Sequence, residues 1–292
     1  NITINNPKKI KFKGTKAYIL ANDLYTANVK TFEDRGMING FINPVDFEFV
    51  GPDDRIFVVD KGDSKVKVVD IARMEITSDI ETGDHTSPVS IVIKGGYRAL
   101  VMNGGAAADS LKDSTIIAID YRDQLVSLAD MMGSLYVGDN PNSAVKINNL
   151  KVLCKGIYDL NDLSTKTQST LATVNPWVMS LTSMQTLGGI YNANNLISNT
   201  EDSRYYFTAE DGIYRMTNNG GGISQLSDIV SDVLFAQIES YNITDTTTAY
   251  SRMIYLNDAE NHPNYLYRYN EALSLITDTI IVDGHVRDIN FY

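Results

Sequence analysis

Short runs of alternating hydrophobic and polar residues recur along the chain, separated by turn-forming residues. The clearest example lies between residues 44 and 83, where PVDFEFV, RIFVVD, KVKVVD and the stretch 74–80 follow one another. Alternation with a period of two is typical of β-strands with one buried face, and residues 51–54 and 61–64 have the composition of tight turns. Four short strands in about forty residues, followed by a similar set, predict one blade of a β-propeller.

Six copies of this pattern fit end to end along the 292 residues, which we interpret as a single all-β domain, 1–292, with a β-propeller fold. In four copies a proline stands at or just before the first strand, where it costs no ladder hydrogen bond. These prolines are Pro7, Pro44, Pro88 and Pro141. The predicted copies cover residues 7–42, 44–83, 88–133, 142–187, 190–232 and 234–284.

The two ends of the chain bear on how the ring closes. Residues 286–292 alternate like a first strand with no strand after it, and residues 1–5 read as a last strand with little before it. Propellers usually close by pairing strands from both termini in one blade, which protects the open edge. The pattern therefore favours seven blades, with the middle strands of the seventh lying upstream of Asn1 or missing. The alternative is six blades, with the C-terminal strand added to the first.

Composition and charge exclude few functions. The net charge of −11 argues against a groove that follows nucleic acid phosphates, because such a groove needs clustered Lys and Arg. No apolar run approaches the roughly eighteen residues of a membrane-spanning helix. The single cysteine, Cys154, lies in an apolar run and has no partner for an internal disulfide, so we expect a buried, unreactive thiol.

Several segments resemble one known family. The stretches DGIYRM (211–216), MIYLNDAENHPNYLYRY (253–269), VDGHVRDINFY (282–292) and above all RIFVVDKGDSKVKVVDI (55–71) are similar to the YncE-like propellers of Bacteroidetes surface proteins. The resemblance implies a seven-bladed propeller, exported as an outer-membrane lipoprotein and encoded beside nutrient-uptake systems. It implies no catalytic set. We therefore expect an extracytoplasmic, cell-surface location, with membrane attachment only through a lipid anchor outside this chain.

Metal binding and catalysis find little support in the sequence. His85 and His285, with Asp84 and Asp283, fall in turns between copies, where they read either as cation ligands or as solvated turn residues. The solvated alternative is favoured, because no H-x-H or H-x-x-x-H spacing occurs. A Ser-His-Asp set or a strained nucleophile turn is equally absent from the sequence. We expect no metal, no cofactor and no catalytic residue.

Polar residues directly follow the second strand of every predicted copy. Loops at this position of a propeller lie with the blade-to-blade turns around the mouth of the central channel, where a rigid scaffold can carry function. Their polarity has two readings: strand caps and turns, which is favoured, or the rim of a binding funnel. The candidate residues for a ligand- or partner-binding face are Asp60, Lys61, His85, Asn103, Lys155, Asp211, Asn257, Asp258, His285 and Arg287.

The sequence therefore predicts a non-enzymatic, extracytoplasmic binding or scaffold propeller that meets a protein or small-molecule partner through this face. One alternative is a propeller hydrolase or lactonase-like enzyme with a metal at the channel mouth. Another is a structural subunit of an outer-membrane uptake assembly. No nucleic acid partner is expected. The fold alone does not choose among these classes, because propellers host all of them.

Overall fold

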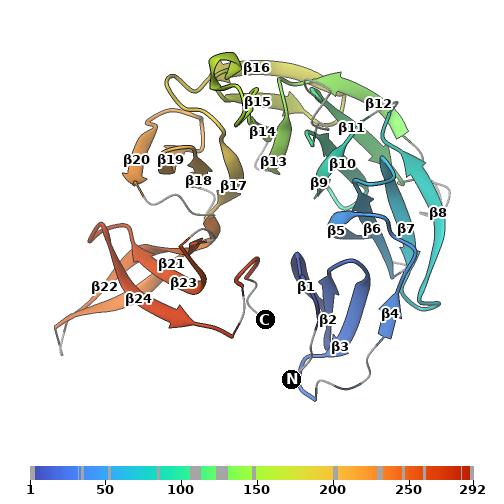
Figure 1. Cartoon of the computed structure of the whole chain (residues 1–292), viewed down its shortest axis with the longest axis horizontal. Helices are drawn as coiled ribbons and strands as arrows, with labels where there is room; N and C mark the ends of the chain where they lie inside the picture. Colours follow the sequence, from blue (N-terminus) through green and yellow to red (C-terminus); the bar gives the residue numbers. More distant parts are fainter. Residues whose placement is uncertain are drawn as a thin grey trace.

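In the computed structural model, the strands form six four-stranded antiparallel sheets arranged around a central axis as the blades of a β-propeller (Figure 1). The all-β propeller fold predicted from the sequence is confirmed. The structure describes residues 4–31, 33, 36–51, 54–83, 86–105, 113–122, 131–146, 149–199, 203–228, 233–244, 247–258, 261–283 and 285–289.

Blades 1 to 3 use the chain up to Tyr136, and within each sheet the strands lie side by side in sequence order. Blade 1 contains β1 (Lys9–Lys13), β2 (Lys16–Leu20), β3 (Leu24–Asn28) and β4 (Gly36–Ile38). Blade 2 contains β5 (Pro44–Val50), β6 (Arg55–Asp60), β7 (Lys65–Asp70) and β8 (Glu75–Glu81). Blade 3 contains β9 (Pro88–Lys94), β10 (Arg98–Asn103), β11 (Thr115–Asp120) and β12 (Met131–Tyr136).

Blades 4 to 6 repeat the arrangement. Blade 4 contains β13 (Pro141–Val145), β14 (Leu150–Cys154), β15 (Thr170–Asn175) and β16 (Ser180–Thr186), with the short 3-10 helix η2 (Leu163–Thr165) between its middle strands. Blade 5 contains β17 (Asn194–Ser198), β18 (Arg204–Ala209), β19 (Gly212–Thr217) and β20 (Ser224–Ser227). Blade 6 contains β21 (Val233–Thr244), β22 (Thr247–Asp258), β23 (His262–Asn270) and β24 (Leu275–Ile281).

The core lies between neighbouring blades, because each sheet presents apolar side chains on both faces. Between blades 2 and 3, for example, Phe57 and Val59 pack with Val101 and Ile117, and all four are fully buried. Each such side chain contributes about 1.5–3 kcal/mol by leaving water. The middle strands therefore need nearly continuous apolar sequence, which explains runs such as RIFVVD and RALVMN.

The lone tryptophan of the chain joins blades 3 and 4 at the ends of the strands. The Trp177 ring lies 5.5 Å from the ring of Tyr97, and the buried Arg98 donates hydrogen bonds of 2.6 Å to the carbonyl oxygens of Pro176 and Trp177. Arg98 also donates to Asp120 at 2.7 Å. Trp177 is thus a blade-packing residue, although 40% of it is exposed.

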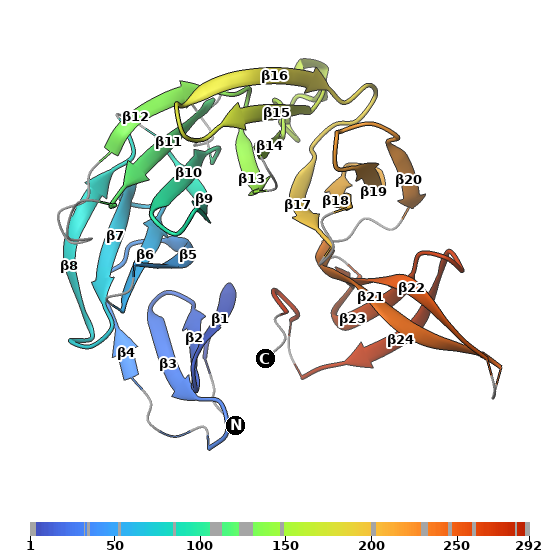
Figure 2. The same cartoon turned by 180° about the vertical axis from the view of Figure 1, so that it is seen from behind.

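Six blades are observed, as in the alternative prediction, although residues 285–289 add no strand to blade 1; the preferred seventh blade is wrong for the part of the chain that the structure describes. The C-terminal residues 285–289 form no strand; they lie between blade 6 and blade 1 in both views (Figures 1 and 2). The segment is held by side chains and loops instead of a ladder. The Val286 N–H donates to the Pro263 carbonyl at 2.9 Å, and the Asp288 carboxylate accepts from the Ile10 N–H at 2.9 Å.

Within the described ranges, no helix is long and apolar enough to span a membrane.

Candidate functional site

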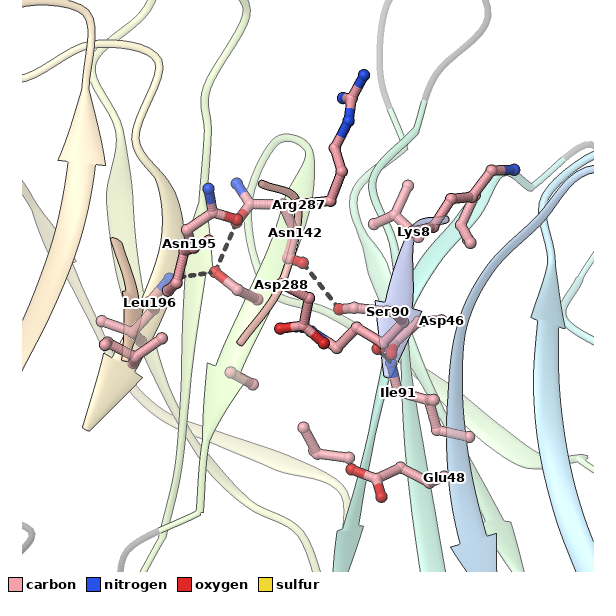
Figure 3. Close-up of a pocket in the computed structure, with 18 of the residues that line it drawn as sticks. Lys8, Asp46, Glu48, Ser90, Ile91, Asn142, Asn195, Leu196, Arg287 and Asp288 are labelled. Atoms are coloured by element: carbon pink, nitrogen blue, oxygen red, sulfur yellow. Dashed lines mark hydrogen bonds and ion pairs between the residues drawn. The ribbon is translucent and has the colours of Figure 1, made fainter. Parts of the chain in front are cut away.

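The inner strands of the six blades and the C-terminal segment surround a central channel with a volume of about 370 Å³ (Figure 3). Its lining combines polar and charged side chains with short apolar stretches. The charged residues are Lys8, Lys9, Lys11, Asp46, Glu48, Arg287 and Asp288. In Figure 3, Arg287 and Glu48 lie at opposite ends of the channel.

Polar side chains of the inner strands connect one blade to the next around this channel. Asp46 Oδ2 on β5 accepts a 3.0 Å hydrogen bond from the Ile91 N–H on β9, and Ser143 Oγ on β13 accepts one of 2.8 Å from the Leu196 N–H on β17. Asp288 makes the same kind of bond to Ile10 on β1. These bonds satisfy inner-strand N–H groups that face away from their own sheet.

The charges inside the channel are largely paired with one another. Lys11 Nζ lies 2.9 Å from Glu48 Oε1, and Lys9 Nζ lies 3.9 Å from Asp288 Oδ1. Burial opposes the charged form of Lys9, but the carboxylates of Asp46, Asp288 and Glu48 together raise its pKa. Burial raises the pKa of Asp288, against the lowering effect of Lys9. The channel interior is therefore internally compensated and leaves little net charge for a ligand.

The loops after the second strands lie beside the blade-to-blade connections, as the sequence predicted. The same backbone hydrogen bond recurs in four blades, from the residue after the second strand to the carbonyl of the connection before the first strand. These bonds are Lys61 N to Asn43 O (3.0 Å), Gly104 N to Ser87 O (3.2 Å), Lys155 N to Asn140 O (2.9 Å) and Glu210 N to Tyr191 O (3.0 Å). We call this end of the propeller the loop face.

Three of the candidate residues on the loop face are buried and stabilise the turns around them. Asp60 is fully buried, and its carboxylate accepts hydrogen bonds from the N–H groups of Ile42 (2.8 Å), Asn43 (2.8 Å) and Gly62 (3.2 Å). The buried Asn103 donates to Thr82 O at 3.0 Å and to Thr115 Oγ1 at 3.1 Å. Asn257 donates to Val286 O at 2.9 Å and so holds the C-terminal segment.

Two candidate lysines, which follow β6 in blade 2 and β14 in blade 4, instead interact electrostatically on the loop face. Lys61 lies against Gly105, so closely that a methyl group on Gly105 would come within 2.8 Å of the Lys61 Nζ. A Cβ on Gly104 would lie against the Pro141 carbonyl oxygen, and Pro141 pairs with Cys154, the residue before Lys155. Burial, and then the neighbouring charge of Lys61, lower the pKa of Lys155. Among the residues described, neither lysine has a carboxylate within 4 Å, although Lys61 also interacts electrostatically with the more distant carboxylate of Asp113.

The remaining candidates are spread around the loop face. Asp211 is exposed and accepts a 2.8 Å hydrogen bond from the Tyr214 hydroxyl. His285 and Arg287 are exposed on the C-terminal segment, and Arg287 also lines the channel. Asp258 is the last residue of β22, but its side chain lies outside the described part of the chain, as does the whole of His85.

Of the possible metal ligands, the part of the chain described in the structure brings together no group of three His, Cys, Asp or Glu side chains that could hold an ion. Cys154 is fully buried, as expected, and burial raises the pKa of its thiol to about 12.

The channel carboxylates Asp46, Glu48 and Asp288 were missed from the sequence. A usable signal existed, because Asp46, Ser90 and Ser143 each stand two residues after the proline that opens the first strand of their copies. A polar residue at a repeated position in otherwise apolar strands indicates a shared structural task.

No family model and no curated protein sequence matches the chain. Solved structures do match its fold. Hydrazine synthase of Kuenenia stuttgartiensis aligns with 97% of this chain and 98% of its own at 13% identity, with a TM-score of 0.65. The Cps50 (Swd1) β-propeller domain of Myceliophteria thermophila aligns over 97% and 88% at 8% identity, with a TM-score of 0.66. The computationally designed Ika8 protein aligns over 98% and 78% at 11% identity, with a TM-score of 0.60. At these identities the similarity shows the β-propeller fold and nothing of activity.

Proposed function

We propose that this β-propeller is a non-enzymatic binding module that holds an anionic group, a carboxylate or phosphate of its ligand or partner, on the loop face. The observation that carries the proposal is that Lys61, which lies against Gly105, interacts electrostatically with Lys155, while neither lysine forms an ion pair within 4 Å among the described residues.

An anion between the two lysines would relieve their repulsion and would find donors already in place. Both lysines start from loops fixed by backbone hydrogen bonds to the blade connections, so little ordering is required on binding. The surrounding chain is acidic overall, with a net charge of −11, so two neighbouring lysines without an ion pair favour an anion at this point of the surface. Lys155 additionally lies 6.0 Å from the Tyr158 ring, which limits its freedom.

The test is calorimetric titration with citrate and inorganic phosphate as probes and sucrose as the neutral comparison. We expect citrate to bind, sucrose not to bind, and Lys61→Ala with Lys155→Ala to weaken citrate binding at least tenfold. Lys30→Ala, at an exposed position before β4, is the matched control and should leave it unchanged. Unaltered citrate affinity in the double variant, or no affinity for either anion, would refute the proposal.

The extracytoplasmic, surface-exposed location and the link to an outer-membrane uptake assembly belong to the same proposal and rest on the sequence resemblance. Protease accessibility on intact cells tests the location, and co-purification with a transporter tests the link. Recovery of the protein only inside lysed cells would contradict a surface role.

A further inference from the structure

Three arginines gather around one carboxylate where blades 5 and 6 lie next to each other (Figures 1 and 2). Arg204 and Arg215 come from β18 and β19 of blade 5, and Arg252 comes from β22 of blade 6. Arg204 begins the second strand of its blade, so the group lies at the end of the propeller away from the loop face. The carboxylate is that of Glu271, which follows β23 and whose N–H donates to the Arg252 carbonyl at 2.9 Å. We call these four residues the arginine cluster.

The single carboxylate is fully engaged inside the cluster. Arg204 and Arg215 each donate through Nη1 to the same oxygen of Glu271, Oε1. The Tyr206 hydroxyl donates to the other oxygen, Oε2, at 2.8 Å. Two guanidinium groups therefore share one negative charge.

Arg252 adds a positive charge that no described acid compensates. Its Nη2 donates to the neutral hydroxyl of Ser203 at 3.1 Å, and its buried Nε has no acceptor among the described residues. Burial and the Glu271 carboxylate raise the pKa of Tyr206, and the charges of Arg252 and Arg204 oppose this rise, so both guanidinium groups act at the same place. Three guanidinium groups to one carboxylate leave an excess of two positive charges.

The excess arises at a position that is balanced in other blades. In blades 2 and 3 the second strand also begins with arginine, and the residue directly opposite on the third strand is an aspartate that forms an ion pair with it. These pairs are Arg55 with Asp70 and Arg98 with Asp120. In blade 5 the residue opposite Arg204 is Thr217, so Arg204 has no acid there and bonds to Glu271 of blade 6 instead. The arginine is kept in blade 5 without its own counter-charge.

A ligand can reach the positive groups of the cluster. The side chains of Arg204 and Arg215 are 34% and 36% exposed, whereas that of Glu271 is only 6% exposed. An approaching ligand therefore meets guanidinium groups and not the carboxylate. Guanidinium N–H groups form a planar fork that fits the oxygens of phosphate-like groups, and a phosphate group carries a charge of about −1.5 to −2 at pH 7. That charge matches the excess of the cluster.

We propose that the arginine cluster binds a doubly negative tetrahedral oxyanion, a phosphate or sulfate group, at the junction of blades 5 and 6. A carboxylate with a single charge leaves part of the positive excess unpaired and should bind more weakly. The cluster lies on the face opposite Lys61 and Lys155, so it does not rest on the anion site of the loop face.

The test is calorimetric titration with inorganic phosphate, sulfate and acetate in the Lys61→Ala, Lys155→Ala double variant, which removes the lysines of the loop face. We expect phosphate and sulfate to bind, and acetate to bind at least tenfold more weakly. Thr217→Asp supplies the acid that blades 2 and 3 carry and should weaken phosphate binding at least tenfold. Thr217→Asn, which removes the same threonine without adding charge, is the matched control and should keep the affinity. Thr217 is exposed, so both variants should fold.

NMR of the arginine side chains locates the bound ion. The Nε–Hε signals of Arg215 and Arg252 should shift as phosphate is added, whereas that of Arg73, an exposed arginine 3.6 Å from Asp70, should not. The proposal is overturned if phosphate does not bind in the lysine double variant, or if acetate binds as tightly as phosphate. It is equally overturned if Thr217→Asp and Thr217→Asn bind phosphate alike, or if the Arg215 and Arg252 signals stay unchanged.

Discussion

Replacing Asp60 by alanine should destabilise the protein strongly, although the residue ends β6 beside a loop that sequence patterns mark as a candidate binding site. The carboxylate accepts three backbone hydrogen bonds while fully buried, and alanine leaves the N–H groups of Ile42, Asn43 and Gly62 without that acceptor. At about 1–1.5 kcal/mol for each lost bond, the cost is about 3–5 kcal/mol. With an unfolding entropy of about 2.1 cal/mol/K per residue, this lowers the Tm by about 5–8 °C for a chain of 292 residues.

The control is Asp211→Ala, an exposed aspartate in the corresponding loop of blade 5. The Asp211 side chain is exposed and accepts a hydrogen bond from the Tyr214 hydroxyl, so removing it should lower the free energy of unfolding by about 1 kcal/mol or less. Asp60→Asn, which keeps one acceptor oxygen, should fall between the two. Thermal unfolding followed by circular dichroism ranks the three variants. The reasoning is refuted if Asp60→Ala is no less stable than Asp211→Ala.

Three further results are expected. Gly104→Ala should lower the free energy of unfolding by about 3 kcal/mol, because the added carbon would collide with the Pro141 carbonyl oxygen and force the contact between blades 3 and 4 apart. Chemical denaturation measures this change. Cys154 should resist thiol reagents in the native protein and react once it unfolds, since burial raises its pKa to about 12. Burial of Asp70 acts to raise its pKa, but the Arg73 N–H and the Arg55 ion pair outweigh this and hold the pKa below the usual value. The stabilisation from Asp70 is therefore complete above the unfolded pKa of about 3.9 and lost as the pH falls below it, and Asp70→Asn should flatten that loss.

Controls for these variants come from similar residues in looser surroundings. Gly133→Ala meets no atom within 4 Å and should not share the penalty of Gly104→Ala. Asp159→Asn, at an exposed turn, should leave the acid dependence of stability unchanged. If Gly133→Ala destabilised the protein as much as Gly104→Ala, close packing at Gly104 would not be the cause. If Asp159→Asn changed the acid dependence as much as Asp70→Asn, the ion pair of Asp70 would not be its cause.

The strand pattern was sufficient to predict the fold because the physical requirement repeats in each blade. Runs such as RIFVVD must be apolar on both faces when a sheet is covered by two neighbours, and prolines such as Pro44 and Pro88 are tolerated at the start of an inner strand. The number of blades was harder to predict. Residues 286–292 alternate like a strand, but alternation does not reveal whether a second strand is present to pair with them.

The candidate site was predictable in position and not in role. Sequence spacing placed Asp60, Lys61, Asn103, Lys155 and Asn257 in equivalent loops, and the recurring backbone bonds of the loop face are consistent with that placement. Whether one of these side chains bonds to the backbone depends on its burial and its rotamer, and neither can be read from the residue pattern of a single sequence. Asp60 and Asn257 bind backbone groups, whereas Lys61 and Lys155 lack a close carboxylate among the described residues.

The most direct test of the whole account is amide hydrogen exchange at Ile10, measured residue by residue by NMR in the native protein and in Asp288→Ala. The central channel depends on the C-terminal segment lying against β1, and the Ile10 N–H bond to Asp288 is a contact that places it there. We predict a protected Ile10 amide that exchanges about 10–100-fold faster in Asp288→Ala, as expected for the loss of a bond that contributes about 1–3 kcal/mol. Rapid exchange already in the native protein, or equal rates in the two proteins, would contradict it.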